Sequence, residues 1–199
     1  MGRLVLVLIV TILSFSGCRK GDEDPFLSLK SRTKRLCGKW RLVELNETYY
    51  IGSNPMMIYD KFEFKLNGGQ MVVYYNGYSV DQYSNIEYWQ FNKNGEYKIE
   101  TEISNSITTI EEGTWNWGAK NKKNDLKKKE YFMLKKLSYN YNNGEEVEEY
   151  SGPTLSPSKE YVVIKLTDET IKLYSFIEIY EKDVEYQKIK SELTLTKEE

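Results

Sequence analysis

The chain has 199 residues, with 28 basic and 30 acidic side chains, a formal net charge of −2 and no histidine. The missing imidazole excludes Ser-His-Asp and Cys-His catalysis and any zinc site with a His ligand, and two cysteines are too few for a zinc cage or a disulfide framework. Near-neutral charge argues against nucleic acid as a partner, and 40% hydrophobic residues argue against a chain that is disordered throughout.

The first residues have the pattern of a targeting signal. Arg3 is followed by an apolar run over residues 4–15, and these 12 residues are too few to span a bilayer, which takes about 20. The pattern predicts a secretory signal peptide over residues 1–17. Its end, Leu-Ser-Phe-Ser-Gly-Cys over residues 13–18, resembles the lipobox of bacterial lipoproteins. An ordinary signal peptide with an accidental cysteine is the alternative.

The lipobox resemblance implies that Cys18 is the lipidation site. In that family the peptide is cleaved before the cysteine, a diacylglyceryl group is attached to its sulfur, and the new amino group receives a further acyl chain such as palmitate. Three chains would hold the protein on a membrane, whereas one binds only marginally. Residues 18–24 then form a flexible acidic tether, in which Arg19 stands where an Asp would favour inner-membrane retention. The resemblance implies the Gram-negative outer membrane; the acidic residues are either a surface-export signal or a plain solvated tether.

A short amphipathic helix is predicted after the tether. Asp24 and Pro25 are typical of a helix start, and apolar residues follow at helical spacing as far as Leu36. This helix would place Lys30, Lys34 and Arg35 on its solvent-facing side. Residues 25–199 are predicted to form one domain, because no change in composition divides them.

From Trp40 onward the hydrophobic period changes to two, which is typical of β-strands. Asn-Gly-type turns at 67–69, 76–77 and 92–95 separate short β-branched and aromatic runs, the pattern of an antiparallel meander. We therefore predict an all-β fold of about eight or nine strands, closed into a barrel or packed as a sandwich so that strand edges are hidden. The runs with this pattern begin at Trp40, lie at 62–66, 71–75, 88–91, 97–103, 115–117, 131–137, 161–166 and 171–180, and end with one inside 184–196.

Several short motifs resemble lipocalin-like bacterial lipoproteins. Gly38-Lys39-Trp40 after the helix is similar to the lipocalin Gly-x-Trp motif, and the segments 24–26, 112–115 and 163–167 are similar to recurrent parts of that lipoprotein group. The resemblance implies an antiparallel up-and-down barrel with a small apolar pocket, in which Trp40 closes the base rather than contacting ligand. Lipocalins pack an Arg of the last strand on this Trp. No Arg follows Arg41 here, so Lys188 or Lys190 would have to replace it in part.

Two functions remain open at this point, and neither is enzymatic. The first is a lipid-anchored, lipocalin-like module that binds a small hydrophobic ligand. The second is a solid-cored interaction protein that contacts another envelope protein or a glycan through exposed aromatic residues, since the chain has 17 Tyr and 4 Trp. For the first function, alternation alone selects the following pocket residues: Phe62, Phe64, Tyr97, Ile99, Trp115 and Trp117.

No motif in the sequence marks a catalytic or metal site. Phosphate-binding glycine loops, a nucleophile elbow and calcium-loop spacing are all missing. The lysine-rich run at 120–129 and the glutamates at 145–149 are interpreted as solvated turns, and Cys37 as a structural thiol. Among 30 acidic residues nothing marks a pair for glycoside hydrolysis. We therefore expect no enzyme activity, no cofactor and no metal.

Overall fold

The computed structural model describes residues 31–119, 130–144, 146–151, 158–179 and 186–198. The predicted signal peptide, Cys18, the tether and the lysine-rich run lie outside the described residues. In the part of the chain that is described, none of the helices has the length and apolar character needed to cross a bilayer.

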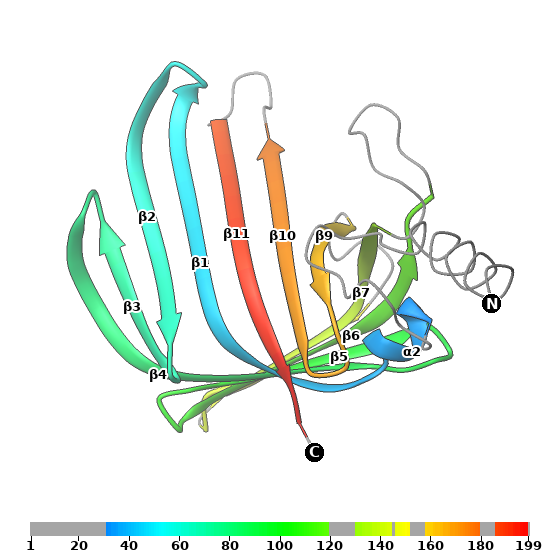
Figure 1. Cartoon of the computed structure of the whole chain (residues 1–199). Coiled ribbons are helices and arrows are strands. Elements are labelled where there is room, and N and C mark those ends of the chain that lie inside the picture. The colour runs from blue at the N-terminus through cyan, green and yellow to red at the C-terminus, as the bar shows by residue number, and fades with distance from the viewer. Residues whose placement is uncertain (1–30, 120–129, 145, 152–157, 180–185, 199) are drawn as a thin grey trace, which may run out of the picture.

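The fold is an all-β antiparallel closed barrel (Figure 1). The sheet order is β6-β5-β4-β3-β2-β1-β11-β10-β9-β7, and the pairing of β6 with β7 closes the ring. The strands are β1 (Gly38–Asn54), β2 (Met57–Asn67), β3 (Gln70–Tyr75), β4 (Tyr78–Phe91), β5 (Glu96–Ile103), β6 (Ile107–Trp117), β7 (Tyr131–Asn142), β8 (Val147–Ser151), β9 (Lys159–Leu166), β10 (Thr170–Ile179) and β11 (Tyr186–Lys197).

The strand number corrects the prediction of eight or nine strands. Ten strands form the barrel, and β8 lies outside it as an edge strand paired with β7. The sequence of β8, Val-Glu-Glu-Tyr-Ser, contains no run of alternating apolar residues, because it buries neither face against the core. A strand of this kind leaves no period-two pattern in the sequence.

The barrel is closed most tightly at one end. There β1 pairs directly with β4 over 38–41, and only from Glu44 onward does β2 take the place of β4 beside β1. The same end holds the pairing of β7 with β9, which covers 131–134, and that of β9 with β10, which ends at Tyr174. Beyond these pairings β1, β11 and β10 continue away from the closed end, as Figure 1 shows. The interior therefore has one packed end and one wider end.

The described helix, α2 (Arg32–Leu36), coincides with the end of the predicted one, whose start at residues 24–30 lies outside the described residues. Ser31 is its N-cap, with its Oγ accepting a hydrogen bond from the Lys34 amide at 3.2 Å. Arg35 was predicted to face solvent, but it is buried and its Nη1 donates to the carbonyl oxygen of Leu166. The prediction was wrong because α2 lies against the closed end of the barrel, so its buried side carries Arg35 as well as Leu36.

Candidate functional site

An aromatic plug fills the closed end of the barrel. Trp40 is fully buried, and its indole Nε1 donates to the carbonyl oxygen of Leu36 at 2.7 Å. Around it the rings of Phe91 and Phe132 meet edge to face with their centroids 5.5 Å apart, and Trp115 lies 5.9 Å from Phe91 in the same arrangement. We call Trp40, Phe91, Trp115, Trp117 and Phe132 the aromatic plug.

The cation on Trp40 is not one of the two predicted lysines. Lys197 Nζ lies 4.7 Å from the Trp40 ring centroid. Lys188 instead stands over Phe176, with its Nζ 5.5 Å from that ring centroid. The last strand extends to Lys197, and its register places this residue directly opposite Trp40.

The six predicted pocket residues fall into three groups. Tyr97 and Ile99 line an interior cavity. Trp115 and Trp117 belong to the plug, where the Trp115 Nε1 donates to the carbonyl oxygen of Asn92 at 3.0 Å. The two phenylalanines of β2 pack elsewhere on the inner wall: Phe64 lies 5.5 Å from the Tyr49 ring and Phe62 lies 4.9 Å from the Tyr75 ring.

The cavity that Tyr97 and Ile99 line has a volume of about 280 Å³. It lies against the wall formed by β4, β5, β6, β7 and β9, where the register sets Trp89 opposite Ile99 and Ile99 opposite Glu111. Its lining combines aromatic, aliphatic and charged side chains: Glu87, Trp89, Tyr97, Ile99, Thr101, Thr109, Glu111, Leu134, Lys136, Tyr139, Lys159 and Tyr161. Two larger hollows also occur, but each is bordered by polar side chains of the outer sheet surface, such as Glu44 and Lys98.

Glu111 and Lys136 form an ion pair in this cavity. The Lys136 Nζ lies 2.7 Å from one carboxylate oxygen, and the Tyr97 hydroxyl donates to the other at 2.7 Å. Burial, and then the hydrogen bond and charge of Glu111, raise the pKa of Tyr97 well above its usual value, so this phenol stays neutral. Both oxygens of Glu111 are thus engaged by protein groups.

Glu87 has a different environment. Its carboxylate accepts hydrogen bonds from the Trp89 Nε1 and from the Thr101 hydroxyl, the latter at 3.1 Å, and both donors are neutral. Burial raises the pKa of Glu87 above its usual value, and these two hydrogen bonds oppose the shift without cancelling it. The group is held in place, but no contacting cation compensates its charge among the described residues.

Lys159 is the first residue of β9 and lines the cavity. Its Nζ is 5.3 Å from the Tyr161 ring centroid. Burial disfavours its charged form, but Tyr161 and Glu47 favour that form, and the net pKa of Lys159 is raised. Burial raises the pKa of Tyr161 to about 12. Glu47, on β1, accepts a hydrogen bond from the Ser191 hydroxyl.

These charged residues were missed in the sequence, although a signal for them exists. Glu87 occupies the same strand phase as the buried Asn85 and Trp89, so alternation places it inside the barrel. Cys37 is half-buried, and burial raises the pKa of its thiol despite the lowering effect of Lys93 and Lys197, so it is not an activated nucleophile. Metal coordination has no candidate within the described ranges, where no three His, Cys, Asp or Glu side chains gather.

The comparisons with known proteins give little further information. No family model matches the sequence, and neither does any curated protein. Among solved structures, the chain is similar to Rv2717c from M. tuberculosis at 12% sequence identity and a TM-score of 0.28, over 86% of this chain and 100% of that one. A similarity at this level is too low to indicate a function.

Proposed function

We propose that the protein is a lipid-anchored, non-enzymatic binding module whose lipocalin-like barrel holds a small ligand above the aromatic plug. The observation that carries the proposal is the cavity of about 280 Å³ in the interior of the barrel. This volume is close to the lower end of small-molecule sites, which begin near 300 Å³. Ile99, Leu134 and the rings of Trp89 and Tyr161 supply surface for an apolar ligand body.

Filling the cavity tests this proposal. In Ile99→Trp the larger side chain would occupy the space, whereas Lys98→Trp places the same side chain on the outer face of the same strand. We expect 2-phenylethanol to bind the wild type and Lys98→Trp, with a change in tryptophan fluorescence because Trp89 lines the cavity. Ile99→Trp should not bind it. Failure of the wild type to bind this alcohol or a charged analogue of the same size would overturn the proposal, and so would undiminished binding by Ile99→Trp.

The lipid anchor is proposed from the sequence. Cys18 follows a signal-like segment, and acylation there would attach the barrel to the Gram-negative outer membrane through residues 18–24. Replacing Cys18 with Ser should move the protein from membrane to soluble fractions, and unchanged membrane association would contradict the anchor. Protease treatment of intact cells then separates the two interpretations of the acidic tether, because only a surface-exposed protein is digested.

An interaction function is the alternative, and one feature favours it. Among the described residues, seven of the twelve exposed large hydrophobic side chains lie between positions 56 and 80, at the β1–β2 and β3–β4 turns. We call these seven the rim patch: Met56, Met57, Ile58, Tyr59, Tyr75, Tyr78 and Val80. Met56 is 95% exposed and Tyr78 78% exposed, whereas Trp89 is buried and is not available to a macromolecular partner.

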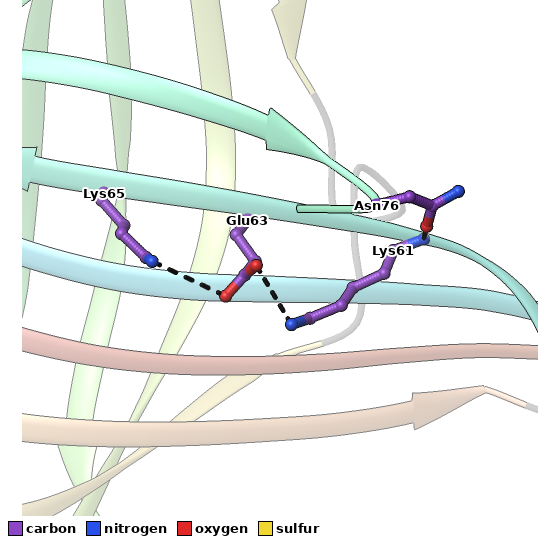
Figure 2. Close-up of polar contacts among 4 residues, drawn as sticks. All are labelled: Lys61, Glu63, Lys65 and Asn76. Atoms are coloured by element: carbon purple, nitrogen blue, oxygen red, sulfur yellow. Dashed lines mark hydrogen bonds and ion pairs between the residues drawn. The ribbon is translucent and has the colours of Figure 1, made fainter. Parts of the chain in front are cut away.

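Hydrogen bonds hold the β3–β4 turn against β2, the strand that begins after the β1–β2 turn. The Lys61 amide donates to the Asn76 Oδ1 at 2.9 Å, and the Asn76 amide donates to the Lys61 carbonyl oxygen at 2.8 Å. Figure 2 shows the contact of the Asn76 side chain with Lys61. It also shows Glu63 between Lys61 and Lys65 along β2, with its carboxylate oxygens 3.0 and 3.8 Å from their ammonium nitrogens.

A variant with both Met56→Ser and Tyr78→Ser tests the alternative. If the rim patch binds an envelope protein or glycan, this variant should lose its partner in cross-linking from intact envelopes while still binding 2-phenylethanol. A variant with Val147→Ser and Tyr150→Ser on β8, which are also exposed, is the matched control. Equal cross-linking by both variants would contradict the alternative.

A further inference from the structure

We propose that the cavity selects a small ligand that carries one protonated amine, and that the amine is placed against Glu87. This inference rests on the proposed ligand-binding function and adds the chemical class of the ligand. It is carried by three features of the interior: the balance of its charges, the contacts of Glu87, and the aromatic lining.

The balance of charges favours a cation. Two carboxylates (Glu87 and Glu111) and two ammonium groups (Lys136 and Lys159) line the cavity. A third carboxylate, Glu47 on β1, lies outside the lining but interacts electrostatically with Lys159. Glu111 and Lys136 compensate each other at 2.7 Å. Lys159 is then the single ammonium group for two carboxylates, because it interacts electrostatically with both Glu47 and Glu87. One negative charge is left over, and a cationic ligand would neutralise it.

The contacts of Glu87 make it the carboxylate that would receive this cation. Glu111 is engaged at both oxygens, by Lys136 and by the Tyr97 hydroxyl. Glu87 also accepts two hydrogen bonds, but from the neutral Trp89 and Thr101, which fix its position without cancelling its charge. A carboxylate oxygen accepts more than one hydrogen bond, so the protonated amine of a ligand in the cavity is able to donate to Glu87 alongside Trp89 and Thr101.

The aromatic lining suits the same class of ligand. Trp89, Tyr97, Tyr139 and Tyr161 all border the cavity, and Trp89 meets Tyr161 edge to face with their centroids 5.3 Å apart. Aromatic faces attract cations, and the attraction grows where water is excluded. An anionic ligand would lie beside Glu87 and Glu111, and the two ammonium groups of the lining, Lys136 and Lys159, already face carboxylates of the protein, so a carboxylate head group is disfavoured.

Three probes of matched size separate the possibilities: 2-phenylethylamine, 2-phenylethanol and 3-phenylpropionate. We expect calorimetric titration of the full chain at neutral pH to give the amine an affinity about tenfold above that of the alcohol, and the acid the weakest binding. In Glu87→Gln the preference for the amine should disappear while the alcohol still binds. Glu112→Gln removes an exposed carboxylate of the outer face and should leave the preference unchanged.

The outcomes are distinguishable. If the alcohol and the amine bind the wild type equally, or the acid binds best, the amine class is overturned and the ligand-binding function stands. If the amine preference survives in Glu87→Gln, the assignment to Glu87 is overturned. If none of the three probes binds the wild type, the ligand-binding function itself is overturned and this inference with it. The comparison of probes on the wild type does not depend on whether any variant folds.

Discussion

The ammonium nitrogen of Lys197 lies 4.7 Å from the centroid of the Trp40 ring, and the two residues are direct partners in the pairing of β1 with β11. The same nitrogen donates to the carbonyl oxygen of Cys37 at 3.2 Å. Gly38 makes this approach possible, because a Cβ there would lie 3.0 Å from the Lys197 side chain and because its φ of +136° is rarely adopted by other residues. At the closed end of the barrel, Lys197 of the last strand thus contacts both Trp40 of the first strand and the residue just before that strand.

Replacing Lys197 with Ala should destabilise the protein modestly. An exposed cation over an aromatic ring contributes about 0.5–1 kcal/mol, and the midpoint of urea unfolding should fall accordingly. Lys197→Arg should be at least as stable as the wild type, because a guanidinium also stacks on the ring. Lys190→Ala is the control, since Lys190 is exposed on the same strand. An equal loss in both alanine variants would show that the contact with Trp40 contributes nothing.

Gly113 should tolerate no side chain. It follows the irregularity in the pairing of β6 with β7, and a Cβ there would lie 2.1 Å from the Lys135 carbonyl oxygen and 2.8 Å from the Tyr97 ring. Gly113→Ala should therefore cost about 1–3 kcal/mol of unfolding free energy and weaken ligand binding by displacing Tyr97. Asn116→Ala, at an exposed position of the same strand, should change neither quantity. A Gly113→Ala protein of wild-type stability would contradict this account.

The strands with alternating residues were predictable from the sequence. The alternation at 62–66 and 97–103 and the turn at Asn76 and Gly77 correspond to observed strands and to a turn with positive φ at both residues. The exposed β8 was missed because it lacks that alternation. The burial of Arg35 was missed because helical periodicity does not reveal that a carbonyl of β9 is available as its acceptor.

The candidate site was predictable only in part. A period of two shows which face of a strand a residue occupies, but not its depth along the barrel. Trp115 and Tyr97 were therefore predicted to share one pocket, whereas Trp115 lies in the plug and Tyr97 lines the cavity. The pairing of distant strands brings Glu87 near Lys159, and this register has no counterpart in a single sequence.

Glu87 should reduce the stability of the protein at neutral pH. Because burial raises its pKa, the folded state binds the proton more tightly than the unfolded chain does. The stability that this proton contributes is fully present below the ordinary Glu pKa of about 4.3, and it is lost as the pH rises through the pKa of Glu87 in the folded protein. The difference in unfolding free energy between Glu87→Gln and the wild type should therefore favour the variant more at about pH 8 than at about pH 4. Urea unfolding at both pH values measures this, and the opposite order would contradict the raised pKa.

Tyr161 should make the barrel sensitive to alkali. Burial raises its pKa to about 12, whereas an ordinary tyrosine titrates near 10. Its contribution to stability is complete below about pH 10 and is lost as the pH rises through the folded value. Denaturant unfolding should show the wild type losing stability between these values, and Tyr161→Phe losing less because it has no phenol to ionise. Tyr78→Phe, at a position 78% exposed, is the control and should behave as the wild type does. Tyrosinate absorbance followed in parallel links the loss to ionisation, and an unchanged alkaline profile in Tyr161→Phe would show that this phenol is not responsible.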